Sequence, residues 1–372
     1  MHSPASRRNF LGCAATAALA ASLARVSAAE PKTAATTPHG ASGTDWPLID
    51  VADEKALLDV LHSGKWGRTS GGARNREFET VFAQRMQAKH CIATSSGTTA
   101  LLTALGALNI GPGDEVVLPP YTFVATFNAI TANFALPVFA DTDPASLQVD
   151  PTSVAAAITP ATRLLLPVHI AGTACDLDGI LAVAKERKLP VLEDACQAPL
   201  AEWRGRPVGT HGIGGCFSFQ ASKNLTAGEG GAIVTNDDEF AHRCYNFHTP
   251  GGGKPAPSLG RAANFRLTEF QAALLLSQWR RFEAQQTTRA DNAAHLTQLL
   301  AAIPGIAPAR LAAGNTRNGW HLYMFRYEAA KFSGLSRAKF LQALAKEGVA
   351  ASAGYTALNR TPHVQALAKN PH

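Results

Sequence analysis

The chain has 372 residues, of which 46% are hydrophobic and 17% charged, a balance that can bury a large core and excludes a disordered or fibrous protein. Its formal net charge is +6, but without Arg7, Arg8 and Arg25 of the N-terminal segment 31 basic residues face 28 acidic ones, a net charge of +3. That charge is too weak, and Lys and Arg are too scattered, for a nucleic-acid-binding surface.

The first 29 residues have the pattern of a twin-arginine signal peptide. The pair Arg7-Arg8 precedes Asn9-Phe10-Leu11, an Ala-rich stretch follows, and small residues at 27–29 offer a cleavage site. The alternative is a short amphipathic helix. We therefore expect export through the twin-arginine machinery, to the periplasm or otherwise out of the cytoplasm, with residues 30–45 as a flexible linker.

Beyond this segment the cysteines predict neither a disulfide framework nor a metal site. Five remain, an odd number without a CxxC pair: Cys91, Cys175, Cys196, Cys216 and Cys244. Most lie beside apolar runs, so we expect small buried core residues. No later stretch is long and apolar enough to span a membrane.

The next part of the chain predicts helices, and then strands alternating with helices. The pattern is helical between Asp53 and Leu108. Short apolar runs follow at residues 115–118, 137–140, 163–170, 190–193, 216–219 and 232–235, with helical segments between several of them, notably 180–187. This order indicates an α/β fold with a mostly parallel sheet covered on both faces, and ligands at the carboxyl ends of its strands.

A long helical pattern then runs from Thr268 to about Ile303, followed by a strand at 320–327 and a helix at 337–347. We expect a large domain over residues 46–275 and a smaller C-terminal α+β domain over 276–372. The chain ends at His372 without an obvious final element, which leaves open whether a C-terminal piece is missing.

The first chemically suggestive segment is Ser95-Ser96-Gly97-Thr98-Thr99, directly ahead of a helix. Free N–H groups at a helix start, together with Ser and Thr hydroxyls, bind phosphate. An ordinary N-cap is the alternative.

The second segment, Val191 to Gln197, places the acid pair Glu193-Asp194 at the end of a buried strand. A carboxylate there can keep a heterocyclic nitrogen protonated. A structural or metal-binding acid is the alternative, but no cluster with ligand spacing accompanies the pair, so we expect no metal.

The third segment runs from Cys216 to Leu225 and carries Lys223 among apolar, aromatic and hydroxyl residues. Such a lysine can be a desolvated amine of lowered pKa that forms a Schiff base. Most lysines are solvated surface charges, and only the neighbouring motifs favour the catalytic interpretation. In a fourth segment, Asn264 and Arg266 open the long helix as a cap and a surface charge, or reach a phosphate across a subunit interface.

Taken in this order, the segments resemble the DegT/StrS (DegT/DnrJ/StrS) family of sugar aminotransferases, which are fold-type-I enzymes dependent on pyridoxal 5′-phosphate (PLP). The resemblance extends from about Trp46 to the end. It rests on Ser96-Gly97-Thr98, residues 113–116, residues 122–126, Pro167-Val168-His169, Glu193-Asp194-Ala195 with Gln197, Phe217-Ser218-Phe219 with Lys223, and residues 228–231.

The resemblance implies a seven-stranded-type, mostly parallel central sheet and a role for each matching residue. Lys223 would form the Schiff base with PLP and move the proton, and Asp194 would pair with the pyridine nitrogen. The remaining cofactor contacts would be Gln197 near the ring hydroxyl, Phe123 on the ring face, and Gly97, Thr98, Ser218 and a neighbouring subunit's Asn264 at the phosphate. The last contact implies a homodimer with shared active sites.

The implied reaction moves an amino group from an amino acid, expected to be glutamate, to a keto sugar or related keto acceptor. Two stretches depart from the family pattern, Ala171-Gly172 and residues 355–359, and both lie where substrate specificity is set. Because nucleotide-linked keto sugars are made in the cytoplasm, an exported enzyme is expected to use a free keto sugar or cyclitol. A PLP lyase, dehydratase or epimerase and a non-catalytic binding protein are the alternatives, although the latter would be expected to lose Lys223 or Asp194.

Overall fold

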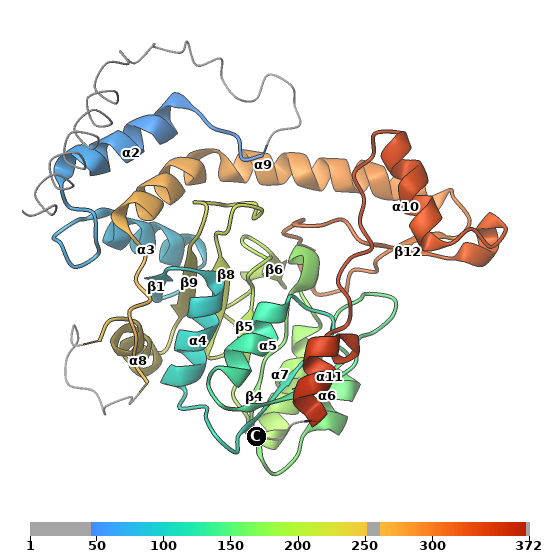
Figure 1. Ribbon diagram of the computed structural model, residues 1–372, viewed down its shortest axis with the longest axis horizontal. Coiled ribbons are helices and arrows are strands. Elements are labelled where there is room, and N and C mark those ends of the chain that lie inside the picture. The colour runs from blue at the N-terminus through green and yellow to red at the C-terminus, as the bar shows by residue number, and fades with distance from the viewer. Residues whose placement is uncertain (1–45, 251–260, 370–372) are drawn as a thin grey trace, which may run out of the picture. The chain divides into compact units, whose positions relative to one another are not determined.

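The structure is a computed structural model that describes residues 46–250 and 261–369 (Figure 1). The predicted signal peptide and linker, residues 1–45, lie outside the described residues. Residues Val51–His372 form one compact unit. The expected boundary between a larger and a smaller domain falls inside α9 (Glu269–Ala301), a single 33-residue helix, and the division stays a prediction.

Strands and helices alternate through the first two thirds of this unit. The helices there are α2 (Val51–Ser63), α3 (Arg74–Arg85), α4 (Gly97–Ala107), α5 (Val124–Thr131), α6 (Pro151–Ala157), α7 (Leu177–Arg187) and α8 (Asp238–His248). After α9 come α10 (Arg337–Lys346) and α11 (Pro362–Lys369).

The principal strands form two sheets. One has the order β3-β2-β4 and is parallel, with β2 (Glu115–Leu118), β3 (Leu136–Phe139) and β4 (Thr162–Leu165). The other has the order β1-β9-β8-β5, with β1 (His90–Thr94), β5 (Leu192–Asp194), β8 (Gly214–Ser218) and β9 (Gly231–Thr235). Parallel bridges from Leu165 to Val191 and from Val168 to Asp194 join the two sheets, so β4 lies beside β5 at the centre.

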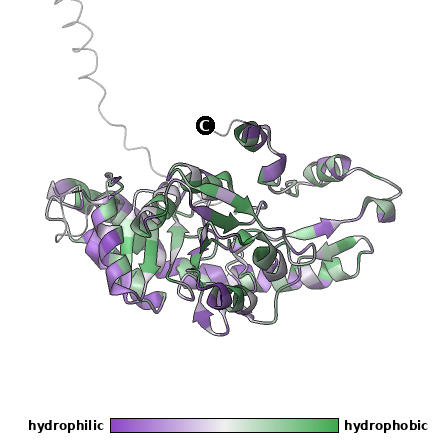
Figure 2. Ribbon diagram, turned by 90° about the horizontal axis from the view of Figure 1, so that it is seen from below, coloured by the Kyte–Doolittle hydropathy of each residue, from purple (hydrophilic) through white to green (hydrophobic). Residues whose placement is uncertain are grey.

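Both faces of the strands are covered, as the continuous apolar runs predict. Val116, Leu164 and Cys216 belong to a core cluster with α4, α5 and α8, whereas their successors Val117, Leu165 and Phe217 belong to a second cluster with α3, α7 and α9. Successive side chains of a strand point to opposite faces. The strands are accordingly largely hydrophobic, whereas the helices carry residues of both kinds (Figure 2).

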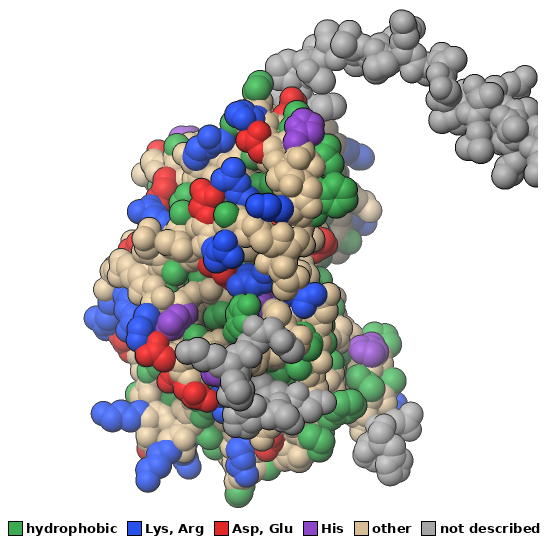
Figure 3. Space-filling view, turned by 90° about the vertical axis from the view of Figure 1, so that its left-hand side faces the viewer, with side chains coloured by type: hydrophobic (Ala, Val, Ile, Leu, Met, Phe, Trp, Pro, Cys, Tyr) green, Lys and Arg blue, Asp and Glu red, His purple; other side chains and the backbone are tan. Residues whose placement is uncertain are grey.

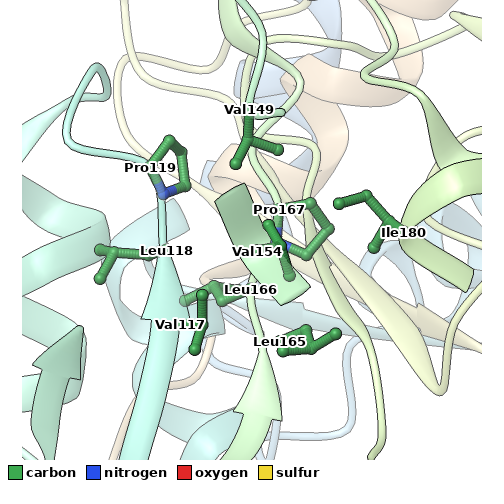
Figure 4. A pocket seen from close by; sticks show the side chains of 9 residues that line it. All are labelled: Val117, Leu118, Pro119, Val149, Val154, Leu165, Leu166, Pro167 and Ile180. Carbon is green, nitrogen blue, oxygen red and sulfur yellow. The ribbon is translucent and has the colours of Figure 1, made fainter. Parts of the chain in front are cut away.

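The core packs closely where the strands carry their largest side chains. Phe78 and Phe82 of α3 are fully buried against Phe217 and Phe219, with ring centroids 5.2 to 5.5 Å apart. A cavity of about 10 Å³ between β2, β4 and α7 is lined only by apolar side chains and Pro119 and Pro167 (Figure 4). It has room for about one water molecule and is a packing gap.

Two predicted elements are wrong in part. The span from Asp53 to Leu108 is not helical throughout, because His90–Thr94 forms β1, whose partner β9 lies about 140 residues later in the chain. The predicted strand at 320–327 is reduced to β12 (Phe325–Tyr327), which pairs with β10 (Ile306–Pro308). Trp320 has a positive φ of 45°, and the N–H groups of Gly319 and His321 bond to the turn at Gly172 and Ala171 instead of to a strand.

The remaining strands are short and lie outside the sheet pair. Of these β6 (Glu202–Trp203) pairs with β7 (Arg206–Pro207) and β11 (Asn315–Arg317). No helix among the described residues is long and apolar enough to cross a membrane.

Candidate active site

The predicted phosphate segment is the amino end of α4, which follows β1 directly. Ser96 is the N-cap and forms a capping box with Thr99: the Ser96 hydroxyl accepts the Thr99 N–H, and the Thr99 hydroxyl accepts the Ser96 N–H. The ordinary cap and the phosphate site are therefore compatible. The cap uses the third N–H of the helix and leaves those of Gly97 and Thr98, which no earlier turn of α4 can satisfy, for an anion.

Glycine is required at position 97 because α4 begins in contact with the end of β8. A Cβ at Gly97 would lie 2.6 Å from the Cβ of Ser218 and 3.0 Å from its hydroxyl oxygen. The Ser218 side chain is buried. The structure thus brings together three of the predicted phosphate contacts, the adjacent Gly97 and Thr98 and, 121 positions after Gly97, Ser218.

The predicted carboxylate, Asp194, is the last residue of β5 and is 4% exposed. Its two oxygens are both held: Oδ1 accepts the Cys196 N–H at 3.1 Å, and Oδ2 accepts the Thr126 hydroxyl at 2.7 Å. Thr126 itself lies 2.9 Å from the Thr122 hydroxyl. Thr126 is a site residue that the predictions missed, although the Thr-x-x-x-Thr spacing places both hydroxyls on one side of a helix start.

Glu193, the other half of the acid pair, faces away from the site and anchors the strand. Oε2 accepts the His169 Nε2–H at 2.9 Å and the Gly209 N–H at 2.6 Å, and Oε1 accepts the N–H groups of His211 at 2.7 Å and Gly212 at 3.0 Å. Burial raises the pKa of Glu193, but these hydrogen bonds and His169 outweigh it and leave the pKa below its ordinary value. The carboxylate is therefore charged.

Lys223 lies in the loop between β8 and β9, which closes through the Ala221 N–H and the Gly228 carbonyl at 2.9 Å. The amine has no hydrogen bond or ion pair within the described part of the chain. Burial lowers its pKa below the ordinary lysine value, and Cys196 and Asp194 oppose that shift electrostatically. A partly buried amine near a fixed carboxylate is the arrangement that the sequence predicted.

Gln197 lies one short turn after Asp194 and is 4% exposed. Its Oε1 accepts the Ala171 N–H at 2.7 Å, and its Nε2 donates to the Tyr355 hydroxyl at 3.0 Å. Phe123, the residue that precedes α5, is 53% exposed, and its ring centroid lies 6.3 Å from that of Tyr355. Tyr355 therefore joins two predicted cofactor residues.

His321 is a second residue that the predictions missed. Its N–H donates to the Ala171 carbonyl at 2.9 Å, and its Nδ1 is buried without a hydrogen-bond partner among the described residues. Burial, and then the charges of Lys223 and Arg289, lower its pKa to about 3. The histidine is thus neutral. It lies within electrostatic range of Lys223, which no spacing in the sequence could indicate.

Asn264 lies near the phosphate end of the site in its own chain. The Ser95 N–H donates to the Phe265 carbonyl at 2.7 Å, and the Asn264 side chain accepts the Arg266 N–H at 3.4 Å. The N-cap of α9 is Thr268 and not Asn264. The contact of Asn264 with a phosphate in a neighbouring subunit stays a prediction.

These residues fit PLP by their chemistry. Two free helix N–H groups and a buried serine hydroxyl suit a phosphate, a fixed carboxylate suits a protonated ring nitrogen, and a partly desolvated amine suits an aldehyde. No group of three or more His, Cys, Asp or Glu residues placed to hold a metal ion occurs within residues 46–250 and 261–369. On the surface that Figure 3 shows, Lys and Arg side chains are interspersed with those of Asp and Glu.

A separate cavity of about 340 Å³ lies along the carboxyl half of α9, with Trp320, Tyr323 and Thr297 in its wall. Neither Lys223 nor Asp194 lines it.

Comparison with known proteins identifies the family of the chain. Residues 47–372 match the DegT/DnrJ/EryC1/StrS aminotransferase family. The chain is 39% identical over 332 residues to L-glutamine:2-deoxy-scyllo-inosose aminotransferase of Streptoalloteichus tenebrarius (84% of this chain, 78% of the relative). It is 37% identical over 313 residues to spore coat polysaccharide biosynthesis protein SpsC of Bacillus subtilis (81% and 79%). The crystal structure of 3-amino-5-hydroxybenzoic acid synthase superimposes with a TM-score of 0.79 at 35% identity (85% and 83%).

Proposed function

Because the chain belongs to the DegT/DnrJ/EryC1/StrS aminotransferase family and is a PLP-dependent aminotransferase, we propose that it transfers the α-amino group of L-glutamine to a keto cyclitol. The observation that carries the proposal is the partly buried Lys223 amine beside the fixed Asp194 carboxylate. Overall, the keto carbon of the acceptor becomes an amine carbon, and glutamine becomes the corresponding 2-oxo acid. L-glutamine replaces the glutamate expected from the sequence, because names of the inosose-aminating relatives specify it.

PLP, when bound, supplies the electron sink that makes the C–H bond next to the amino group acidic. The chain's own residues position the cofactor and move the proton. Asp194, held by Thr126 and the Cys196 N–H, presents a fixed negative charge to the ring nitrogen. The amine of Lys223, with its lowered pKa, can accept a proton at Nζ and return it. The start of α4 and the Ser218 hydroxyl would hold the phosphate and so fix the position of the cofactor relative to Asp194 and Lys223.

Two features support a compact acceptor without a nucleotide. Ala171, which is 1% exposed, occupies a position where many family members have tyrosine, so the turn carries a methyl group in place of their ring. Its backbone is fixed by Gln197 and by the His321 N–H, so the turn is held on both sides. The twin-arginine pattern of residues 7–29 is the second feature, since an exported enzyme does not meet nucleotide-linked sugars.

We extend the proposal to the oligomeric state, the cellular location and the central sheet. The family resemblance supports a homodimer in which Asn264 completes the phosphate site of the neighbouring subunit, and residues 1–29 support export. The sheets β3-β2-β4 and β1-β9-β8-β5, joined by two parallel bridges, support a single seven-stranded sheet. Light scattering tests the dimer, and fractionation of cells that produce the full chain tests export: residence of the tagged protein in the cytoplasm contradicts it.

The function is tested with the purified protein and two separated half-reactions. L-glutamine alone should convert the visible absorbance of bound PLP into that of the amino form, and scyllo-inosose or 2-deoxy-scyllo-inosose should then reverse the change. A nucleotide-linked keto sugar serves as the matched acceptor. Turnover with nucleotide-linked acceptors alone refutes the cyclitol assignment, and no spectral response to any common amino donor favours a lyase or epimerase.

A further inference from the structure

Gln197 is a predicted cofactor residue whose orientation is set from a distant part of the chain. Its Oε1 accepts the Ala171 N–H at 2.7 Å, which fixes which end of the amide is oxygen, and one Nε2–H donates to Tyr355 at 3.0 Å. The second Nε2–H has no partner within residues 46–250 and 261–369. A donor on a side chain that is only 4% exposed is costly to leave unpaired, which points to a bound acceptor.

Tyr355 is itself held in place by aromatic contacts and by the backbone. Its ring lies edge-on to those of Tyr121, with centroids 6.0 Å apart, and Phe123, at 6.3 Å. Three residues later, the Leu358 N–H donates to the Pro120 carbonyl at 2.8 Å, and Leu358 is buried. The segment therefore crosses the Tyr121–Phe123 turn at a fixed point and brings the hydroxyl to Gln197.

We propose that Tyr355 is a positioning residue that acts through Gln197: by accepting one amide N–H, it directs the other toward the ring hydroxyl of the cofactor. The inference rests on the proposed PLP function. The amide is then fixed at both ends, by Ala171 at the oxygen and by Tyr355 at the nitrogen. Loss of the tyrosine hydroxyl leaves the nitrogen end free to rotate away.

The positioned N–H has a measurable consequence. A hydrogen bond donated to the ring oxygen stabilises its deprotonated form and so lowers the pH at which the bound cofactor loses its proton. The titratable groups that face Tyr355 are Tyr121, on the same turn as Phe123, and Asp194 at the end of β5. Tyr355→Phe changes neither group, so a shift in the pH midpoint of the absorbance reports the Gln197 contact.

The experiment is a pH titration of the visible absorbance of the PLP-loaded protein. In Tyr355→Phe, the ring and its packing are kept and the acceptor is lost, and we expect the midpoint to rise by about 0.5 to 1 pH unit. Tyr121→Phe removes a neighbouring hydroxyl that makes no contact with Gln197, and its midpoint should stay within about 0.2 unit of the parent protein. Circular dichroism verifies that each variant is folded.

The Gln197→Ala background separates this role from a merely structural one. In that background, Tyr355→Phe should shift the midpoint no further, because the route through the amide is already absent. A midpoint unchanged by Tyr355→Phe, or a shift that persists without Gln197, overturns the inference and leaves the proposed function intact. A parent protein without a visible PLP band overturns the proposed function and this inference with it.

Discussion

The contacts of the buried Glu193 carboxylate predict how much unfolding free energy a substitution there would remove. Each oxygen accepts two hydrogen bonds: Oε1 from His211 and Gly212, and Oε2 from Gly209 and His169. In Glu193→Gln, either amide orientation turns an NH₂ group toward two N–H donors, so two bonds to a charged acceptor are lost. At roughly 1.5 to 3 kcal/mol each, the variant should lose about 3 to 6 kcal/mol of unfolding free energy, a large part of the typical total.

Urea unfolding followed by circular dichroism measures this loss. With a slope of roughly 3 kcal/mol per molar, the midpoint should fall by about 1 to 2 M, whereas Glu202→Gln, which breaks a partly exposed ion pair with Arg317 at 3.8 Å, should move it by less than about 0.3 M. The pKa of Glu193 is lowered from 4.5, so its contribution is present above pH 4.5 and lost below as the folded-state carboxyl is protonated. Equal midpoints for Glu193→Gln and Glu202→Gln at pH 7 would refute the reasoning.

Three further variants test the site. Lys223→Ala should abolish turnover and the borohydride-reducible adduct with PLP, and a retained adduct on this variant would assign another lysine. Gly97→Ala places a methyl group 2.6 Å from the Ser218 Cβ and should weaken PLP binding at least about tenfold and cost roughly 1 to 3 kcal/mol; Gly111→Ala, whose Cβ would meet its nearest atom at 3.4 Å, is the control. The pKa of His321 is lowered from 6.5 to about 3, so the unfolded chain binds the extra proton between these values and stability falls as pH falls. His321→Asn should lessen the decrease in melting temperature between pH 7 and pH 4.5, and the exposed His363→Asn should not.

The strands that adjoin the site were predictable because their signal is local. The apolar run at 115–118 coincides with β2, and those at 190–193, 216–219 and 232–235 fall within two residues of β5, β8 and β9. A strand buried on both faces has to be apolar throughout, and turn residues interrupt it at both ends. β1 was missed because its five residues are flanked by strong helical patterns and its pairing with β9 is non-local.

The candidate site residues likewise separate into those with a local signal in the sequence and those without one. Asp194 and Lys223 could be predicted, since each follows a recognisable strand within a few positions. Thr126, His321 and Tyr355 could not. They reach the site because β5 is hydrogen-bonded within a sheet, because the segment around Trp320 bonds to the Gly172 turn, and because the Leu358 N–H bonds to the Pro120 carbonyl. These contacts join residues far apart in the chain.

We expect the two sets of residues to control different properties of the enzyme. Under the proposed function, residues next to the strand ends would hold the cofactor phosphate and ring nitrogen and supply the amine. The contacts of His321 and Tyr355 meet at one place, the Ala171 turn, where Gln197 bonds to the N–H and His321 to the carbonyl, with Tyr355 bonded to the same Gln197. Since Ala171 and residues 355–359 are also where the sequence departs from the family pattern, a change of acceptor would act on the same residues that orient the ring hydroxyl contact. Substitutions of Ala171 should therefore alter the absorbance midpoint of bound PLP together with acceptor preference, whereas substitutions at the start of α4 should alter cofactor affinity and leave the midpoint and the acceptor preference unchanged.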